Sequence, residues 1–202
     1  MTPQYPSALA KRKRFPKRSD ASKSGADPEI CDILEIQMMR PAPHLHQQEN
    51  HIIDDGQYWV KRASVSWRDL QKAVEDPAGP LWLNGYSSGQ GQNDRVPEAL
   101  LGQFARSLYL LRADKLSLVT AAELGSSGGS RRRVRAQFEN CGHTYRLVVT
   151  DPWIERQCRA RPDGETELLD GLLYVSLGEI FKGFAYKLVA AVITAQRVMA
   201  NA

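Results

Sequence analysis

The sequence has few cysteines and no long apolar run. Cys31, Cys141 and Cys158 stand far apart and form no Cys-x-x-Cys pair, which matches neither a disulfide framework nor a zinc site, so we expect reduced thiols. No apolar stretch approaches the roughly 20 residues that a membrane helix needs, and the basic start lacks the apolar core of a secretion signal. These absences predict a globular cytoplasmic protein with no membrane partner.

Recognisable catalytic patterns are missing as well. The four histidines are scattered, so no Ser-His-Asp or Cys-His set can be assembled from the sequence. The glycine- and serine-rich stretch 126–130 lacks the lysine and the spacing of a phosphate-binding P-loop. We therefore predict no catalytic residues and no cofactor, and favour a binding protein over an enzyme.

Positive charge is concentrated at the start of the chain. Six basic residues lie between Lys11 and Arg18 with no acidic residue before Asp20. These six exceed the formal net charge of +4 by two, so everything after Arg18 carries a formal charge of −2. With its prolines and serines, segment 1–28 is predicted to be a disordered tail, either solvated without a specific role or binding phosphate backbone.

The carboxy-terminal half predicts two paired strands. Residues 131–138 alternate, with Val134, Ala136 and Phe138 on one side and charged or polar residues on the other. Asn140-Cys-Gly142 has turn chemistry, and 144–149 then returns as an antiparallel partner. Tyr145 shares its parity with Leu147 and Val149, which predicts that it faces the core.

The elements around this hairpin follow the order of an OB-fold. A first strand is expected within 107–119, Asp151-Pro152 begins a short helix, and strands 172–177 and 184–193 follow. Five strands with a helix between the third and fourth form a small barrel whose second and third strands typically bind oligonucleotides. We assign this barrel to residues 105–195 and expect a tail over 196–202.

Residues 29–104 predict a smaller, less regular β unit. Strands are expected at 30–38 and 58–63, and Ser66-Trp-Arg-Asp69 should cap a short helix. Residues 84–94 form a turn-rich loop, of the kind that often carries function, and Pro97 begins another short helix. The fold class is thus mainly β with short helices, comprising tandem OB-like barrels of which the first, 29–104, is incomplete.

Arginines gather on the second strand of the predicted barrel, and they form the most favourable nucleic-acid surface in the chain. Because the folded part is slightly acidic, any such surface must be a local patch. The predicted phosphate-binding residues are Arg131, Arg132, Arg133, Arg135, Arg146 and Lys182.

A polar loop at residues 41–55 is the second candidate site. His44 and His46, two residues apart on an extended segment, point the same way and could share a metal, with Glu49, His51 or Asp54 as a third ligand. The simpler interpretation is that these side chains order the loop, and the remaining one is contact with a base edge or a ribose hydroxyl. We predict no metal, and assign to the ligand loop His44, His46, Gln47, Glu49, Asn50, Trp59, Asn93, Asp94 and Arg95.

Asn93-Asp94-Arg95 and the four tryptophans also have structural interpretations. The simplest one for the first group is a helix cap with an Arg95 salt bridge. Trp59, Trp67, Trp82 and Trp153 are expected in the core more than as stacking platforms.

Several short words of the sequence together resemble the dual OB-containing domain family of prokaryotes. The resemblance covers about 29–193 and rests on Pro43-His-Leu-His-Gln-Gln-Glu-Asn50, Gln57-Tyr-Trp-Val60, Leu83-Asn-Gly-Tyr86, Asn93-Asp-Arg-Val-Pro97, Val149-Thr-Asp-Pro152, Val175-Ser-Leu-Gly-Glu179 and Tyr186-Lys-Leu-Val-Ala-Ala-Val-Ile193. It implies two tandem OB-like barrels and a nucleic-acid or nucleotide sensing module of bacterial defence loci. Family members usually begin with a Gly-Trp-Ile-Arg-Pro-Val-like segment that residues 1–27 do not contain, so we expect a first barrel truncated at its start.

The sequence therefore leaves three functions open. The leading one is a non-catalytic module that binds single-stranded nucleic acid or a nucleotide. The second is a metal-dependent nuclease or phosphoesterase centred on His44 and His46. The third is a scaffold whose open barrel edge, near 33–38, pairs with an effector protein or a second copy.

Overall fold

The computed structural model describes residues 28–124 and 128–200. The predicted disordered tail and its basic run lie outside the described residues, except for Pro28. The strands are β1 (Asp32–Glu35), β2 (Met38–Pro41), β3 (His51–Ile53), β4 (Val60–Ser64), β5 (Arg95–Pro97), β6 (Leu108–Arg112), β7 (Asp114–Leu124), β8 (Ser130–Asn140), β9 (His143–Val149), β10 (Gly164–Glu167), β11 (Leu172–Phe181) and β12 (Phe184–Ile193). The helices are α1 (Trp67–Lys72), the 3-10 helix η2 (Glu98–Gln103), α2 (Pro152–Arg159) and α3 (Ala195–Ala200).

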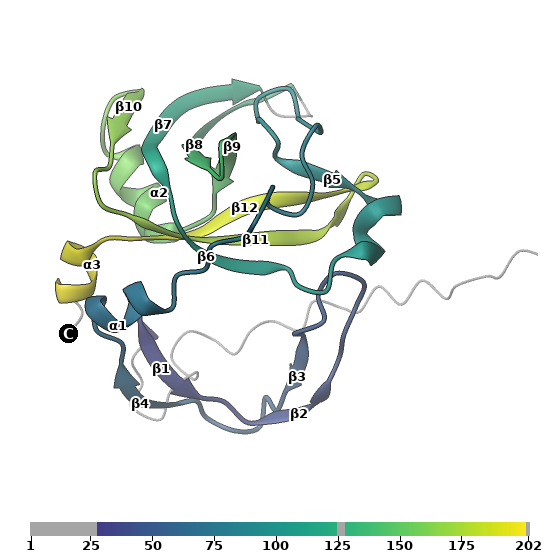
Figure 1. Cartoon of the computed structure of the whole chain (residues 1–202). Coiled ribbons are helices and arrows are strands. Elements are labelled where there is room, and N and C mark those ends of the chain that lie inside the picture. The colour runs from purple at the N-terminus through teal and green to yellow at the C-terminus, as the bar shows by residue number, and fades with distance from the viewer. Residues whose placement is uncertain (1–27, 125–127, 201–202) are drawn as a thin grey trace, which may run out of the picture.

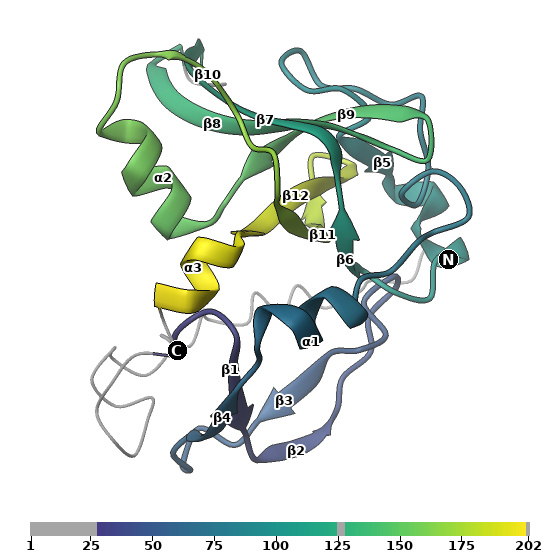
Figure 2. The same cartoon turned by 60° about the vertical axis from the view of Figure 1, so that its left-hand side comes forward.

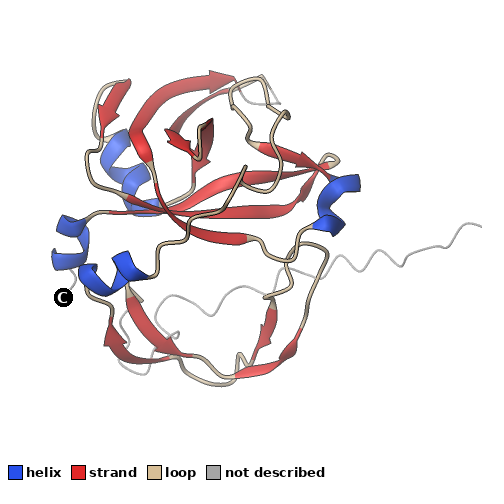
Figure 3. Cartoon of the chain, viewed as in Figure 1, coloured by secondary structure: helices blue, strands red, loops and turns tan. Residues whose placement is uncertain are grey.

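The strands from β6 onward form a small closed barrel. The sheet order is β10-β7-β8-β9-β12-β11-β6, and β9 and β12 run parallel while their neighbours are antiparallel (Figures 1 and 3). Only Ala113 separates β6 from β7, yet β6 pairs with β11 and β7 pairs with β8. One bent segment thus pairs with β11 through β6 and with β8 through β7, which closes the barrel in the five-strand order of an OB-fold, and β10 adds to the free edge of β7.

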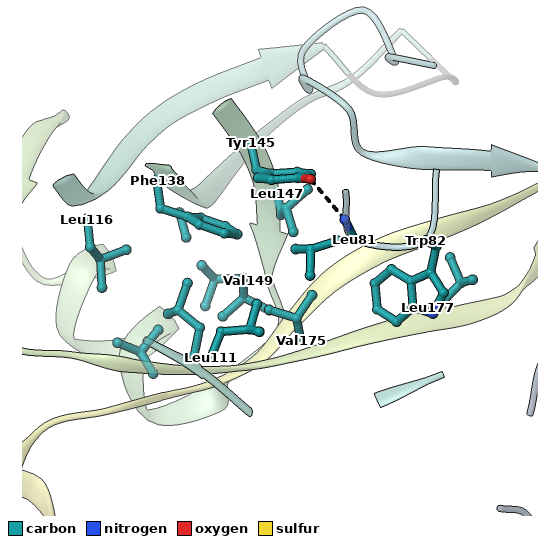
Figure 4. Packing of buried hydrophobic residues seen from close by; sticks show 14 of the residues in the cluster. Leu81, Trp82, Leu111, Leu116, Phe138, Tyr145, Leu147, Val149, Val175 and Leu177 are labelled. Atoms are coloured by element: carbon teal, nitrogen blue, oxygen red, sulfur yellow. Dashed lines mark hydrogen bonds between the residues drawn. The ribbon is translucent and has the colours of Figure 1, made fainter. Parts of the chain in front are cut away.

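Local sequence patterns explain most of this barrel. Val134, Ala136 and Phe138 are buried, as are Tyr145 and the alternate residues that follow it, so the predicted inward faces are confirmed (Figure 4). Asp151 caps α2 by accepting a hydrogen bond from the Trp153 backbone N–H at 3.0 Å, with Pro152 at the first helical position. The helix between the third and fourth strands is therefore confirmed.

Two predicted boundaries differ in the structure. The strand expected over 30–38 is divided into β1 and β2, because residues 36–37 lie outside either strand. The residues expected to form a tail instead contain α3, whose Val198 is buried against Leu172 and Ile193. An apolar partner surface, which the sequence does not reveal, makes this short helix favourable.

Residues 28–75 pack beside the barrel as a curved pair of ribbons. β1 pairs with β4, and β2 pairs with β3, in two separate two-stranded sheets (Figure 2). Within the described residues these four strands do not close a barrel, and the outer edges of both sheets are unpaired. Helix α1 begins at Ser66, which accepts the Asp69 backbone N–H at 3.1 Å as predicted.

The ribbons contact the barrel through a small apolar cluster and through their loops. Trp67, Leu70 and Val74 pack against the cluster around Leu172. The Glu75 carboxylate accepts the Leu110 backbone N–H at 3.0 Å and pairs with Arg106. The tip of the β2–β3 hairpin reaches the barrel at β11.

Candidate nucleic-acid interface and ligand pocket

The arginines of β8 divide into neutralised and unpaired side chains. Arg135 is only 6% exposed, and its Nε donates to Glu123 Oε1 at 2.5 Å while Nη1 lies 3.9 Å from Asp94 Oδ2. The expectation that Arg135 contacts phosphates is therefore corrected. Arg135 shares the outward parity of Arg131 and Arg133, but the loop that carries Asp94 covers it.

Arg132 is also occupied within the fold. Its Nε donates to Asp163 Oδ1 at 2.6 Å, and its other nitrogens donate to the backbone carbonyls of Arg159 and Arg161. These bonds hold the loop that follows α2 against β8. Arg132 is consequently a structural residue rather than a free cation for a ligand.

Arg131, Arg133 and Arg146 form what we call the free arginine face. They alternate with core residues and so point outward from β8 and β9. Among the described residues, no acidic side chain lies within ion-pair distance of any of them. Arg131 is exposed, whereas Arg133 and Arg146 are half-buried and the Arg146 Nε is buried without a hydrogen-bond partner among the described residues. These unpaired charges lie on the strands that typically hold oligonucleotides in this type of barrel.

The β11–β12 hairpin carries a second group of aromatic side chains with cations beside them. Phe181 is 58% exposed, and the Lys182 ammonium lies 5.4 Å from the centroid of its ring. The Arg95 guanidinium lies 4.2 Å from the Phe184 ring centroid, and Tyr186 lies 6.5 Å from Phe181, centroid to centroid. Phe184 and Tyr186 are half-buried, so Phe181 is the most accessible of these rings. Accessible rings beside cations are suited to stacking on bases whose phosphates lie nearby.

Arg95 forms no ion pair among the described residues and lies over the Phe184 ring, so the salt bridge expected for it is wrong. The buried Asp94 accepts hydrogen bonds from the Ser88 backbone N–H at 2.7 Å and from its hydroxyl at 2.5 Å. Pro97 precedes η2 without a side-chain cap, so the predicted cap is also wrong. Asp94 instead fixes the 84–94 loop and neutralises Arg135.

The rest of that loop attaches to β9. Gln92 and Arg146 exchange two backbone hydrogen bonds of 3.2 and 3.1 Å, and Asn93 Nδ2 donates to the Thr144 carbonyl at 3.0 Å. Asn93 and Asp94 thus hold the loop on the barrel, and they do not line the pocket of the His44 loop described next. Trp59, half-buried just before β4, does not line it either.

His46 fastens the β2–β3 hairpin to a bulge in β11. The pairing of β11 with β12 shifts between Leu177 and Ile180, which leaves local carbonyls outside the ladder. His46 Nε2 lies 3.1 Å from both the Leu177 and the Gly178 carbonyl oxygens. Since carbonyl oxygens only accept, Nε2 must carry the hydrogen.

Glu49 provides a second anchor for the same loop. Its carboxylate accepts the Ser107 backbone N–H at 3.1 Å and the Ser107 hydroxyl. Partial burial would raise its pKa, but the hydrogen bonds from Ser107 outweigh this and hold the pKa of Glu49 below its usual value. Glu49 is thus committed to the start of β6.

The loop and the bulge enclose a pocket of about 380 Å³. His44, His46, Gln47 and Asn50 line it from the loop, and Glu179 and Ile180 line it from β11. Four of the predicted ligand-loop residues therefore meet in one place. Within residues 28–124 and 128–200, no group of three His, Cys, Asp or Glu side chains could hold a metal ion.

The sequence patterns did not predict a buried polar cluster inside the barrel. Lys187 is 1% exposed, and its Nζ donates to the Leu83 carbonyl at 2.6 Å and to Asn84 Oδ1 at 3.2 Å. The Tyr145 hydroxyl accepts the Leu81 N–H at 3.0 Å (Figure 4) and the Asn84 amide at 3.1 Å. A lysine at an inward position of β12 was the signal that could have revealed it.

Burial strongly affects the ionisation of this cluster. Desolvation lowers the pKa of Lys187 to about 7, although the nearby Asp94 opposes the shift. Desolvation raises the pKa of Tyr145, and the hydrogen bonds from Leu81 and Asn84 oppose it. The cluster is closed by backbone and side-chain partners, so its evident role is to attach residues 81–84 inside the barrel.

Comparison with known families agrees with the closed barrel and its strand order. The model of the dual OB-containing domain matches residues 10–192. The chain belongs to the dual OB-containing domain family. Searches of curated proteins and of solved structures find no match. In the part that the structure describes, no helix of this dual OB protein is long and apolar enough to span a membrane.

Proposed function

We propose that this dual OB protein is a non-catalytic module that binds single-stranded nucleic acid or a nucleotide. In this proposal the free arginine face contacts phosphates, Lys182 adds a further contact, and Phe181 and Tyr186 stack on bases. A cytoplasmic location and a sensing role in a prokaryotic defence system belong to the same proposal, and they rest on the family resemblance and on the composition.

The proposal rests on the observation that some arginines of β8 and β9 are ion-paired and others are not. The fold neutralises Arg132 and Arg135 with Asp163, Glu123 and Asp94, as their ion pairs show. It leaves the three arginines of the free arginine face unpaired on the strands that typically bind oligonucleotides. Cations without partners on such a face supply the electrostatic part of binding.

The test is the salt dependence of binding to labelled oligothymidylate by the full chain. Replacing Arg131, Arg133 and Arg146 together by Ala should weaken binding. It should also reduce the slope of log K against log salt by about 2, because each phosphate contact on a single strand contributes about 0.7. Fluorescence anisotropy over a range of sodium chloride concentrations measures both quantities.

A matched control removes the same charge elsewhere. Arg40 on β2, Arg68 on α1 and Arg156 on α2 are exposed, and a variant with Ala at all three should keep the parental slope. The basic run at 11–18 is present in every variant, so its contribution cancels in the comparison. Equal slopes for the two triple variants would contradict the assignment of the free arginine face.

A further inference from the structure

The pocket between the His44 loop and the β11 bulge joins parts of the chain that are about 130 residues apart. His46 reaches Leu177 across 131 residues and Gly178 across 132. A volume of about 380 Å³ lies within the range of small-molecule sites, which is about 300–1,000 Å³. Segments 43–50 and 175–179, which both carry the family resemblance, contribute residues to its lining. The pocket is therefore formed by the tertiary fold rather than by one loop.

His46 is buried where the loop meets the bulge, and its two ring nitrogens differ in their contacts. Its Nε2 carries the hydrogen that faces the two carbonyls, so in the neutral ring Nδ1 bears the lone pair. Nδ1 is buried and has no hydrogen-bond partner among residues 28–124 and 128–200, and the His46 residue is 1% exposed. A buried acceptor without a partner is unfavourable, and Nδ1 is not open to a ligand in the pocket of this structure.

Glu179 places a carboxylate on the β11 side of the pocket. It lies in the β11 bulge, it is exposed, and no described cationic side chain pairs with it. Asn50 Nδ2 donates to Gln47 Oε1 at 3.2 Å. The pocket therefore offers a carboxylate to hydrogen-bond donors, and the negative charge of that carboxylate disfavours a phosphate.

Building on the proposed function, we infer that this pocket selects a guanine base. Guanine presents a ring N–H beside an exocyclic amine, and one carboxylate can accept both hydrogens in a bidentate arrangement. Adenine presents an acceptor at the ring position where guanine has its N–H, so Glu179 would face a lone pair. Ile180 supplies an apolar surface for the flat base.

The surroundings favour a nucleotide over a cationic peptide that would offer similar N–H donors. Lys182 lies three residues beyond Glu179, and Arg95 of β5 stacks on Phe184, which belongs to the same hairpin as Lys182. This positive charge attracts the phosphate that accompanies a nucleotide and repels an arginine side chain. The carboxylate would thus contact the base while the cations remain outside for the phosphates.

The experiment compares oligothymidylates that differ at one central base, using the full chain at fixed salt. Guanine should bind about tenfold tighter than adenine at that position, with hypoxanthine between them because it keeps the ring N–H and lacks the amine. In Glu179→Gln the preference for guanine over adenine should fall below about twofold, while affinity for plain oligothymidylate stays near the parental value. Glu165→Gln, an exposed carboxylate on β10, should leave the preference intact.

Two further ligands separate the possible sources of the same chemistry. Guanosine monophosphate that binds in a Glu179-dependent manner, with adenosine monophosphate weaker, would support guanine selection for free nucleotides as well. An arginine amide that competes in a Glu179-dependent manner, without any preference for guanine, would overturn the inference. A salt-dependent interaction with oligonucleotides but no base preference would overturn it too, and would leave the proposed function standing. Absence of all oligonucleotide and nucleotide binding would refute both.

Discussion

Replacement of the buried Lys187 by Met should change how stability depends on pH. In the folded protein burial lowers the pKa of this lysine to about 7, whereas the unfolded value is the ordinary 10.5. Between these two values the unfolded state holds a proton that the folded state has released. Stability should therefore rise with pH from about 7 towards 10.5, and the Lys187 contribution should be constant below pH 7, where both states are protonated.

The size of the effect follows from the same two values. One pKa unit corresponds to about 1.4 kcal/mol, so the full window is worth about 5 kcal/mol. About 2 kcal/mol of this should be gained between pH 7 and pH 9. Lys187→Met removes the titrating group, so this gain should be missing from the variant.

Urea denaturation of both proteins at several pH values from 6 to 9 measures the effect. The variant also deprives the Leu83 carbonyl and Asn84 of a donor, but this loss does not depend on pH and only offsets the two curves. Other titrating groups are common to both proteins, so the difference curve isolates Lys187. Lys182→Met, which removes an exposed lysine, serves as the control and should follow the parental curve.

Parallel curves for the parent and Lys187→Met would refute the reasoning. They would mean that the buried ammonium keeps its proton throughout, so that the Leu83 carbonyl, Asn84 and Asp94 compensate fully for its burial. A gain in stability as the pH falls would contradict the sign of the shift.

Three further expectations concern the loops and caps around the barrel. Arg135→Ala should destabilise the fold by about 3 kcal/mol in urea melts, because it leaves buried carboxylates unpaired. The control Arg131→Ala should change stability by less than about 0.5 kcal/mol, and equal losses in the two variants would contradict the division of the β8 arginines. Gly91→Ala would place a Cβ 1.8 Å from Asp94 Oδ2, so the 84–94 loop should detach and amide exchange there should rise; unchanged protection would argue against the packing. Asp151→Ala removes the cap of α2 and also the carboxylate that lies 2.5 Å from Arg197. The free energy of unfolding should fall by about 3–5 kcal/mol, and a fall of less than about 1 kcal/mol would count against the buried ion pair.

Local patterns determined the barrel strands, the turn between β8 and β9, and the caps at Ser66 and Asp151. Such features depend on a residue and its neighbours within a few positions, so alternation and capping chemistry are visible in one sequence. The order of strands and helix was enough to predict an OB-like barrel before any coordinates. The division of the first predicted strand into β6 and β7 was less visible, because the bend at Ala113 serves pairing with two distant strands.

Tertiary structure alone decided which polar residues are available to a ligand. Arg131 and Arg135 have the same parity on the same strand. Glu123 on the paired strand β7 and Asp94 from the 84–94 loop form ion pairs with Arg135 and not with Arg131. His46 had a plausible metal role in the sequence, but the β11 bulge occupies its Nε2. The sequence determined which face each side chain takes, because parity is local; contact with residues far away in the chain determined whether that face is covered, because burial is a property of the whole fold.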